Sequence, residues 1–165
     1  MATILIVDPD RSAGTVLSGL LKAAGYKTHV VRRFESARRL LAPTRPDLLI
    51  TTVRLGRFNG LHLVIQGRAN NPRLEAIALD ATRDPVLERD AKHHGVTAYV
   101  VKPVRRRELL GLVTEALTGR ARARQTGRSP SSSRRAPKLR LVHPPIKTAA
   151  SQSSVRSRPK RSAIR

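Results

Sequence analysis

Short apolar runs alternate along the chain with segments in which apolar residues recur at helical spacing. The apolar runs are rich in β-branched residues and end at turn residues, which is typical of strands, whereas the periodic segments are typical of amphipathic helices. We predict strands at 3–7, 28–31, 47–51, 76–79 and 98–101. We predict helices at 16–24, 34–41, 61–69, 85–94 and 104–117.

Glycine and proline mark the ends of several predicted helices. Gly25 follows the first helix and can adopt the left-handed conformation that closes a helix. Pro43 lacks the N–H that a continuing helix needs, so we expect the second helix to stop there. Pro85 fits the first turn of the fourth helix, where the missing N–H has no partner to lose.

The alternation of strands and helices predicts an α/β domain over residues 1–118, a single five-stranded parallel sheet flanked by five helices. The runs at 4–7, 48–50 and 98–101 are continuously apolar, as expected for strands buried on both faces. Functional groups of such sheets gather beyond the carboxyl ends of the strands. The chemistry-bearing residues there are Asp8, Asp10, Thr52, Asp80 and Lys102.

Charge is distributed unevenly along the chain. The sequence carries 33 Lys and Arg residues against 11 acidic ones, a net charge of +22. All the acidic residues precede residue 119, whereas 119–165 contains 14 basic residues and no acidic one. Such a segment repels itself and attracts anionic partners. We predict that 119–165 is a disordered basic tail rich in Arg, Ser and Pro; the simpler alternative is a tail that is merely solvated.

The predicted tail has three candidate partners. Its charge could bind nucleic acid or another polyanion, without sequence specificity because it has no aromatic residue for base stacking. An anionic membrane surface is the weaker alternative, because the tail has neither a lipidation signal nor an amphipathic helix. The tail's apolar segment, 139–146, is either a chance cluster or a short peptide that docks on a partner in extended form.

The sequence lacks the hallmarks of several protein classes. It has no cysteine, which excludes disulfides, thiolate metal sites and thiol nucleophiles. No stretch reaches the roughly 18 apolar residues of a membrane helix, and the N-terminus does not fit a signal peptide, so we expect a cytoplasmic protein. There is neither a Gly-rich dinucleotide motif nor a P-loop, and the adjacent His93 and His94 diverge on a helix. We expect neither an enzyme nor a bound cofactor.

The segments at the predicted strand ends resemble the receiver domain of bacterial response regulators, over residues 1–118. ILIVDPD at 4–10 is similar to the family's first strand, and PDLLITTVRLGRFNGLHL at 46–63 to its third strand and the following loop. IALDATRD at 77–84 and GVTAYVVKPV at 95–104 are similar to its fourth and fifth strands. The resemblance implies a flavodoxin-like, doubly wound fold and a role in two-component phosphorelay signalling, in which a histidine kinase phosphorylates an aspartate.

The resemblance also implies roles for single residues, and two positions depart from the family pattern. Asp8 matches the first of two magnesium-binding acids, but Pro9 stands at the second position, with Asp10 beside it. Thr52 stands where the family has its phosphoacceptor aspartate. A threonine hydroxyl is not ionised and would form a stable ester rather than a labile acyl phosphate. We expect no dedicated metal site, and only weak magnesium binding at Asp8 and Asp10.

The remaining positions complete a degenerate phosphorylation pocket. Asp80 stands at the family's phosphoryl-contacting Ser or Thr, and Lys102 and Pro103 match its Lys-Pro pair, whose peptide bond is expected to be cis. Tyr99 matches an aromatic position on the output face. Three interpretations are open: phosphorylation of Thr52 with Asp80 as base, phosphorylation of Asp80 itself, or a charge cluster in which Lys102 neutralises the acids and Thr52 bonds to Asp80.

We favour the charge cluster and therefore interpret the chain as a degenerate receiver. It is predicted to bind another signalling protein through its receiver face, independently of phosphorylation. The alternative is a non-specific nucleic-acid-binding protein that acts through residues 119–165.

Overall fold

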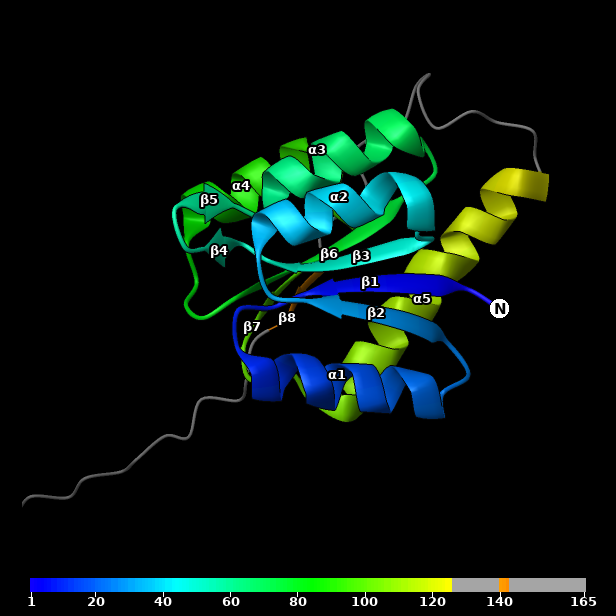
Figure 1. The fold of residues 1–165 in the computed structure, drawn as a ribbon, viewed down its shortest axis with the longest axis horizontal. Coiled ribbons are helices and arrows are strands. Elements are labelled where there is room, and N and C mark those ends of the chain that lie inside the picture. The colour runs from blue at the N-terminus through cyan, green and yellow to red at the C-terminus, as the bar shows by residue number, and fades with distance from the viewer. Residues whose placement is uncertain (126–139, 143–165) are drawn as a thin grey trace, which may run out of the picture.

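The computed structural model describes residues 1–125 and 140–142 (Figure 1). Strands and helices alternate as β1 (Thr3–Val7), α1 (Arg11–Ala23), β2 (Lys27–Val31), α2 (Phe34–Thr44), β3 (Leu48–Thr52), α3 (Leu61–Asn70), β6 (Glu75–Asp80), α4 (Pro85–His93), β7 (Ala98–Val101), α5 (Arg106–Gln125) and β8 (Arg140–Val142). Between β3 and α3, the short strands β4 (Arg54–Leu55) and β5 (Phe58–Asn59) form an antiparallel pair that the sequence did not predict. The predicted α/β class is confirmed.

The main sheet is parallel, with the strand order β2-β1-β3-β6-β7-β8. It contains the five predicted strands and adds β8 beside β7. β1 lies between β2 and β3, so that Ile4 pairs with Thr28 on one side and with Leu48 on the other. The order of the strands reverses there, and the carboxyl ends of β1 and β3 flank the switch point at which sheets of this kind bind ligands.

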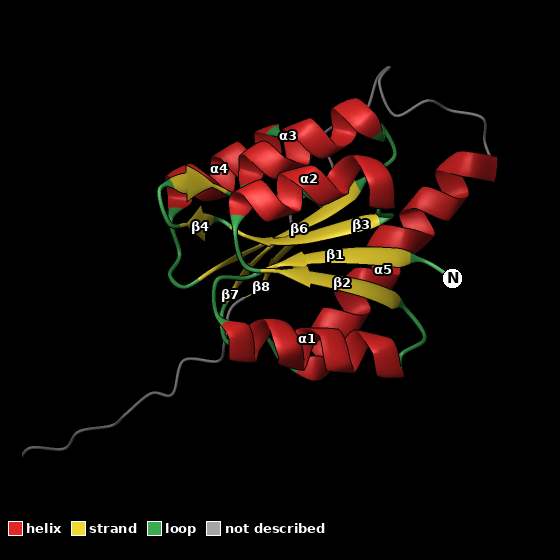
Figure 2. Cartoon of the chain, in the orientation of Figure 1, coloured by secondary structure: helices red, strands yellow, loops and turns green. Residues whose placement is uncertain are grey.

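The helices form a layer on each face of the sheet (Figures 1 and 2). α1 and α5 cover one face, and α2, α3 and α4 cover the other. Because successive residues of a strand point to opposite faces, β1 directs Ile4 and Ile6 to the first layer and Leu5 and Val7 to the second. All four side chains are fully buried. This explains why the central strands are apolar throughout.

Helix boundaries differ from the predictions in informative ways. α1 begins at Arg11, earlier than predicted, because the Asp10 carboxylate caps it by accepting from the Ser12 N–H at 2.8 Å. Gly25 closes α1 with a φ of 86°, as expected. The prediction that Pro43 ends α2 is wrong: it lies in the last turn, the helix continues to Thr44, and Arg45, whose φ is 40°, caps it. The proline ring fixes φ near the helical value, so only one backbone hydrogen bond is lost.

The predicted boundary at residue 118 falls inside a helix. α5 continues through 119–125, and residues 140–142 form a strand, so the prediction of disorder is wrong for these two segments. Alternating Ala and Arg after Gly119 are good helix formers, which a reading for apolar periodicity overlooks. The rest of the predicted tail, 126–139 and 143–165, lies outside the described residues. Among the helices that the structure describes, none is long and apolar enough to span a membrane.

Candidate functional site

Three of the predicted pocket residues meet beyond the carboxyl ends of β1, β3 and β7. The Lys102 ammonium donates to Asp8 Oδ2 at 2.5 Å and to Thr52 Oγ1 at 3.2 Å. The Asp8 side chain is completely buried, whereas a quarter of the Lys102 side chain, 25%, is exposed. The peptide bond between Lys102 and Pro103 is cis, as the resemblance implied. The structure thus assembles this part of the predicted cluster.

Asp10 does not join Asp8 as a second inward-facing acid. Its backbone N–H donates to Asp8 Oδ1 at 3.0 Å, while its carboxylate accepts from the N–H groups of Ser12 and Ala13 at the start of α1. Pro9 offers no side-chain donor. Magnesium requires several hard oxygen ligands, but of these two acids only Asp8 is buried, and its carboxylate is already paired with an ammonium group. These residues therefore do not fit a magnesium ion.

Asp80 lies at the end of β6 and has its own set of partners. Its carboxylate is buried and accepts from the Tyr99 hydroxyl at 2.6 Å and from the Ala81 N–H at 2.8 Å. Arg54, two residues beyond β3, lies 3.6 Å from Asp80 and 3.0 Å from Asp84. The expected bond between Thr52 and Asp80 is therefore replaced by two separate systems, Lys102 with Asp8 and Thr52, and Asp80 with Tyr99 and Arg54.

The side chain of Tyr99, predicted to belong to the output face, points into the protein. Tyr99 is fully buried in the apolar layer under α2, α3 and α4, and its hydroxyl points to Asp80. Burial, followed by the hydrogen bond to Asp80, raises the pKa of this phenol well above its ordinary value. The phenol therefore stays protonated and acts as a fixed hydrogen-bond donor to Asp80.

Arg54 is the member of the site that the sequence analysis missed. Its guanidinium lies between Asp80, at the end of β6, and Asp84, the residue that caps the start of α4. Arg54 therefore links β6 to α4. The signal was present in the sequence: a basic residue closely follows the third strand, at the edge of the sheet where functional groups gather. Its two acidic partners lie 26 and 30 positions later, so only the fold reveals the pairing.

Glycine at position 60 allows the loop after β3 to close tightly. A Cβ atom at Gly60 would lie 2.1 Å from the Thr52 carbonyl oxygen and 2.7 Å from Thr51 Oγ1. Gly60 also donates from its N–H to the carbonyl of Val53 at 2.7 Å. The Asn59-Gly60 pair therefore fixes the backbone around Thr52.

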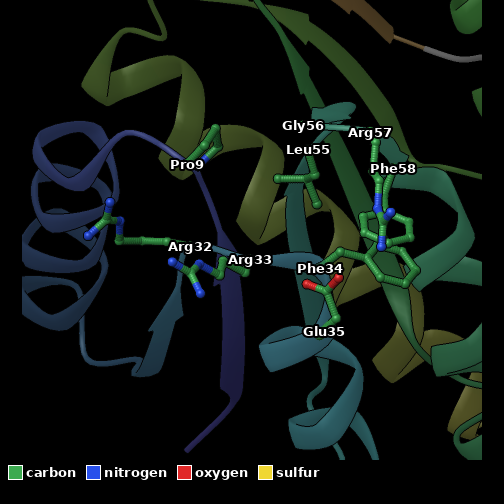
Figure 3. Close-up of a pocket in the computed structure, with 9 residues that line it drawn as sticks. All are labelled: Pro9, Arg32, Arg33, Phe34, Glu35, Leu55, Gly56, Arg57 and Phe58. Atoms are coloured by element: carbon green, nitrogen blue, oxygen red, sulfur yellow. The ribbon is translucent and has the colours of Figure 1, made fainter.

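A pocket of about 340 Å³ lies beside the charge cluster. Figure 3 shows residues of the β2–α2 turn on one side and the β4–β5 hairpin on the other. Phe34 and Phe58 stack with their ring centroids 4.7 Å apart, and the Arg57 guanidinium lies 4.9 Å from the centre of the Phe58 ring. The Phe58 ring therefore contacts both the Phe34 ring and the Arg57 guanidinium. The lining residues are Pro9, Arg32, Arg33, Phe34, Glu35, Leu55, Gly56, Arg57 and Phe58.

Comparisons with known proteins agree with this architecture. Residues 4–114 match the model of the response regulator receiver domain. The chain is 32% identical over 116 residues to the DNA-binding transcriptional regulator NtrC of Azospirillum brasilense, covering 70% of this chain and 24% of the relative. It is 35% identical over 108 residues to the response regulator MprA of Mycolicibacterium vanbaalenii, covering 65% and 46%. The chain thus spans less than half the length of both curated relatives.

Solved structures show the same fold. A CheY-like response regulator receiver domain from Methanospirillum hungatei superimposes with a TM-score of 0.71 at 21% identity, over 74% of this chain and 98% of that one. A response regulator from Chloroflexus aurantiacus superimposes with a TM-score of 0.65 at 28% identity, over 71% and 98%. The fold of the first 120 or so residues is therefore shared with independent receiver structures.

Proposed function

The chain belongs to the response regulator receiver domain family, and from this premise we propose that it signals without being phosphorylated on its receiver, by binding another signalling protein. In the family, phosphorylation shifts an equilibrium between two conformations. A receiver without a phosphoacceptor aspartate still has the fold, but the binding of a partner protein would then set the equilibrium between the two conformations.

The observation that carries this proposal is the state of position 52. Thr52 supplies a neutral hydroxyl, which accepts a hydrogen bond from the Lys102 ammonium. β3 ends in two threonines, so it carries no ionised group that could attack phosphorus. The Lys102 ammonium is also held by Asp8. Asp8 also has no second carboxylate beside it with which to bind magnesium.

Phosphorylation of Asp80 is the competing possibility, and its surroundings oppose it. The Asp80 carboxylate is fully buried, takes a hydrogen bond from Tyr99 and is covered by Arg54. A phosphoryl donor would have to displace both groups to reach it. The Lys102 ammonium, which would have to contact the phosphoryl group, donates to Asp8 and Thr52 instead.

The test is labelling by radioactive acetyl phosphate with magnesium, followed by hydroxylamine, which cleaves acyl phosphates. We expect no label on the wild type or on Thr52→Asn, which matches aspartate in size without its charge. Thr52→Asp restores an ionised acceptor, and adding Pro9→Asp restores the paired acid, so the label should increase in that order. Hydroxylamine-sensitive label on the wild type would overturn the proposal, and peptide mapping would show whether Asp80 carries it.

The basic C-terminal segment supports a second candidate function, non-specific binding of nucleic acid. Residues 119–165 hold 14 basic residues and no acidic one, and each phosphate contact on duplex DNA lowers log K by about 0.9 per tenfold rise in salt. Binding of full-length protein to duplex DNA should therefore be steeply salt-dependent. Neutralising part of the tail should reduce the slope, whereas an equal change on the folded surface should not. The two matched variants are R156Q/R158Q/R161Q and R38Q/R39Q/R73Q.

The salt titration separates the two functions. Equal slopes for both triple variants would mean that the tail is not the binding element. Absence of binding by wild type at low salt would remove the second function and leave the protein-binding proposal untouched.

A further inference from the structure

β8 extends the receiver sheet by one strand that comes from the basic C-terminal region. It runs parallel to β7, with Arg140 opposite Ala98, Leu141 opposite Tyr99 and Val142 opposite Val100. Within the described residues, β8 is the only part of the chain that pairs with this side of β7. Without it, β7 would be the edge of the sheet.

The backbone of β7 presents half of its polar groups to β8. Thr97, just before β7, donates to the Ala76 carbonyl of β6 at 2.8 Å. Successive residues of a strand turn their backbone groups to opposite neighbours. The Tyr99 N–H therefore faces β6, and the Val100 N–H faces β8. An unpaired row of such groups is a template for any extended peptide.

The chain has the length to reach this edge. α5 has 20 residues, which extend about 30 Å, so it carries the chain back past the start of β7. The 14 residues 126–139 can span at most about 50 Å, enough to return to the first residue of β8. A helix of this kind is also the usual connection between two adjacent parallel strands.

We propose that residues 140–142 are an intrachain peptide ligand of the β7 edge. The receiver thus binds its own C-terminal segment by strand addition, through main-chain pairing. A partner that pairs with the same edge must first displace β8. This inference does not depend on whether position 52 is phosphorylated.

The test is amide hydrogen exchange by NMR on the full-length protein. In Leu141→Pro the centre of β8 loses its N–H and cannot pair as a strand. We expect the Val100 amide to exchange at least about tenfold faster, while the neighbouring Tyr99 amide, which faces β6, keeps its wild-type rate. Ala150→Pro places the same residue in the C-terminal region outside β8 and should change neither rate.

Three results would contradict the proposal. Unchanged exchange of Val100 in Leu141→Pro would show that β8 does not protect the edge. Equal acceleration of Tyr99 and Val100 would make β8 an integral part of the sheet rather than a separable ligand. Protection of Val100 that grows with protein concentration in the wild type would mean that a second copy of the chain supplies the strand.

Discussion

Removing the ammonium group of Lys102 should destabilise the protein more than removing the charge of its partner Asp8. Lys102→Met keeps most of the stem's volume. Within the part of the chain that the structure describes, it leaves the fully buried Asp8 carboxylate with the Asp10 N–H, 3.0 Å away, as its one hydrogen-bond donor. Breaking a buried pair in this way costs about 3–5 kcal/mol. The Lys102 side chain is 25% exposed, so water can partly replace it, and we expect the lower end, about 3 kcal/mol.

The reverse change should cost less. In Asp8→Asn the ammonium of Lys102 is partly exposed and can turn toward solvent, so we expect a loss of about 1–2 kcal/mol. The double variant Asp8→Asn/Lys102→Met has no unpaired buried charge, and its loss should be smaller than the sum of the two single losses, because the residues are in direct contact.

Urea unfolding followed by far-UV circular dichroism measures these differences. The protein has no tryptophan, so fluorescence offers little, and guanidinium salt would screen the ion pair. At roughly 3 °C of midpoint shift per kcal/mol for a domain of this size, Lys102→Met should also melt about 10 °C lower. If Asp8→Asn is as costly as Lys102→Met, or if the two losses simply add, the charge cluster does not work as described.

Two further predictions concern the same region and its surroundings. Burial and Asp80 raise the pKa of Tyr99 in the folded protein above its unfolded-state pKa of about 10. The protonated phenol therefore contributes its full stabilisation below about pH 10, and this contribution declines as the pH rises further. Urea midpoints from pH 8 to 11 should therefore fall more steeply for wild type than for Tyr99→Phe, and parallel curves would refute this role. Gly60→Ala should cost about 1–3 kcal/mol or more, because its Cβ would meet the Thr52 carbonyl oxygen. Gly111→Ala, in α5 with no neighbour near the new methyl group, should gain up to about 1 kcal/mol, and similar effects of both substitutions would contradict the contacts described.

The strands and their chemistry could be predicted because local patterns determine them. Residues 98–101 were predicted with the bounds that the structure has, since a strand buried on both faces is apolar at every position. The charged groups that follow the strands could also be located, because parallel strands bring their carboxyl ends to one edge. The pairing of Lys102 with Asp8 depends on side-chain reach as well, because β3 and β6 lie between β1 and β7 in the sheet.

The choice of partners within the site could not be predicted from the sequence. Asp80 lies near several donors, and only side-chain packing decides that Tyr99 points inward and that Arg54 turns back over it. β4 and β5, of two residues each, are shorter than any periodic pattern. The apolar segment around Leu141 was visible, but its partner is a row of backbone groups, which no side-chain pattern encodes.

Covering β7 also bears on how the protein behaves at high concentration. The sheet has two outer strands, β2 and β8. β2 begins with the exposed Lys27, and a charged side chain of this kind discourages edge-to-edge aggregation. β7, with the sequence AYVV, carries no charge, and without β8 it would be an unprotected edge strand able to pair with another molecule. We therefore expect a chain that loses β8, by proteolysis or truncation, to self-associate more readily than the full-length protein.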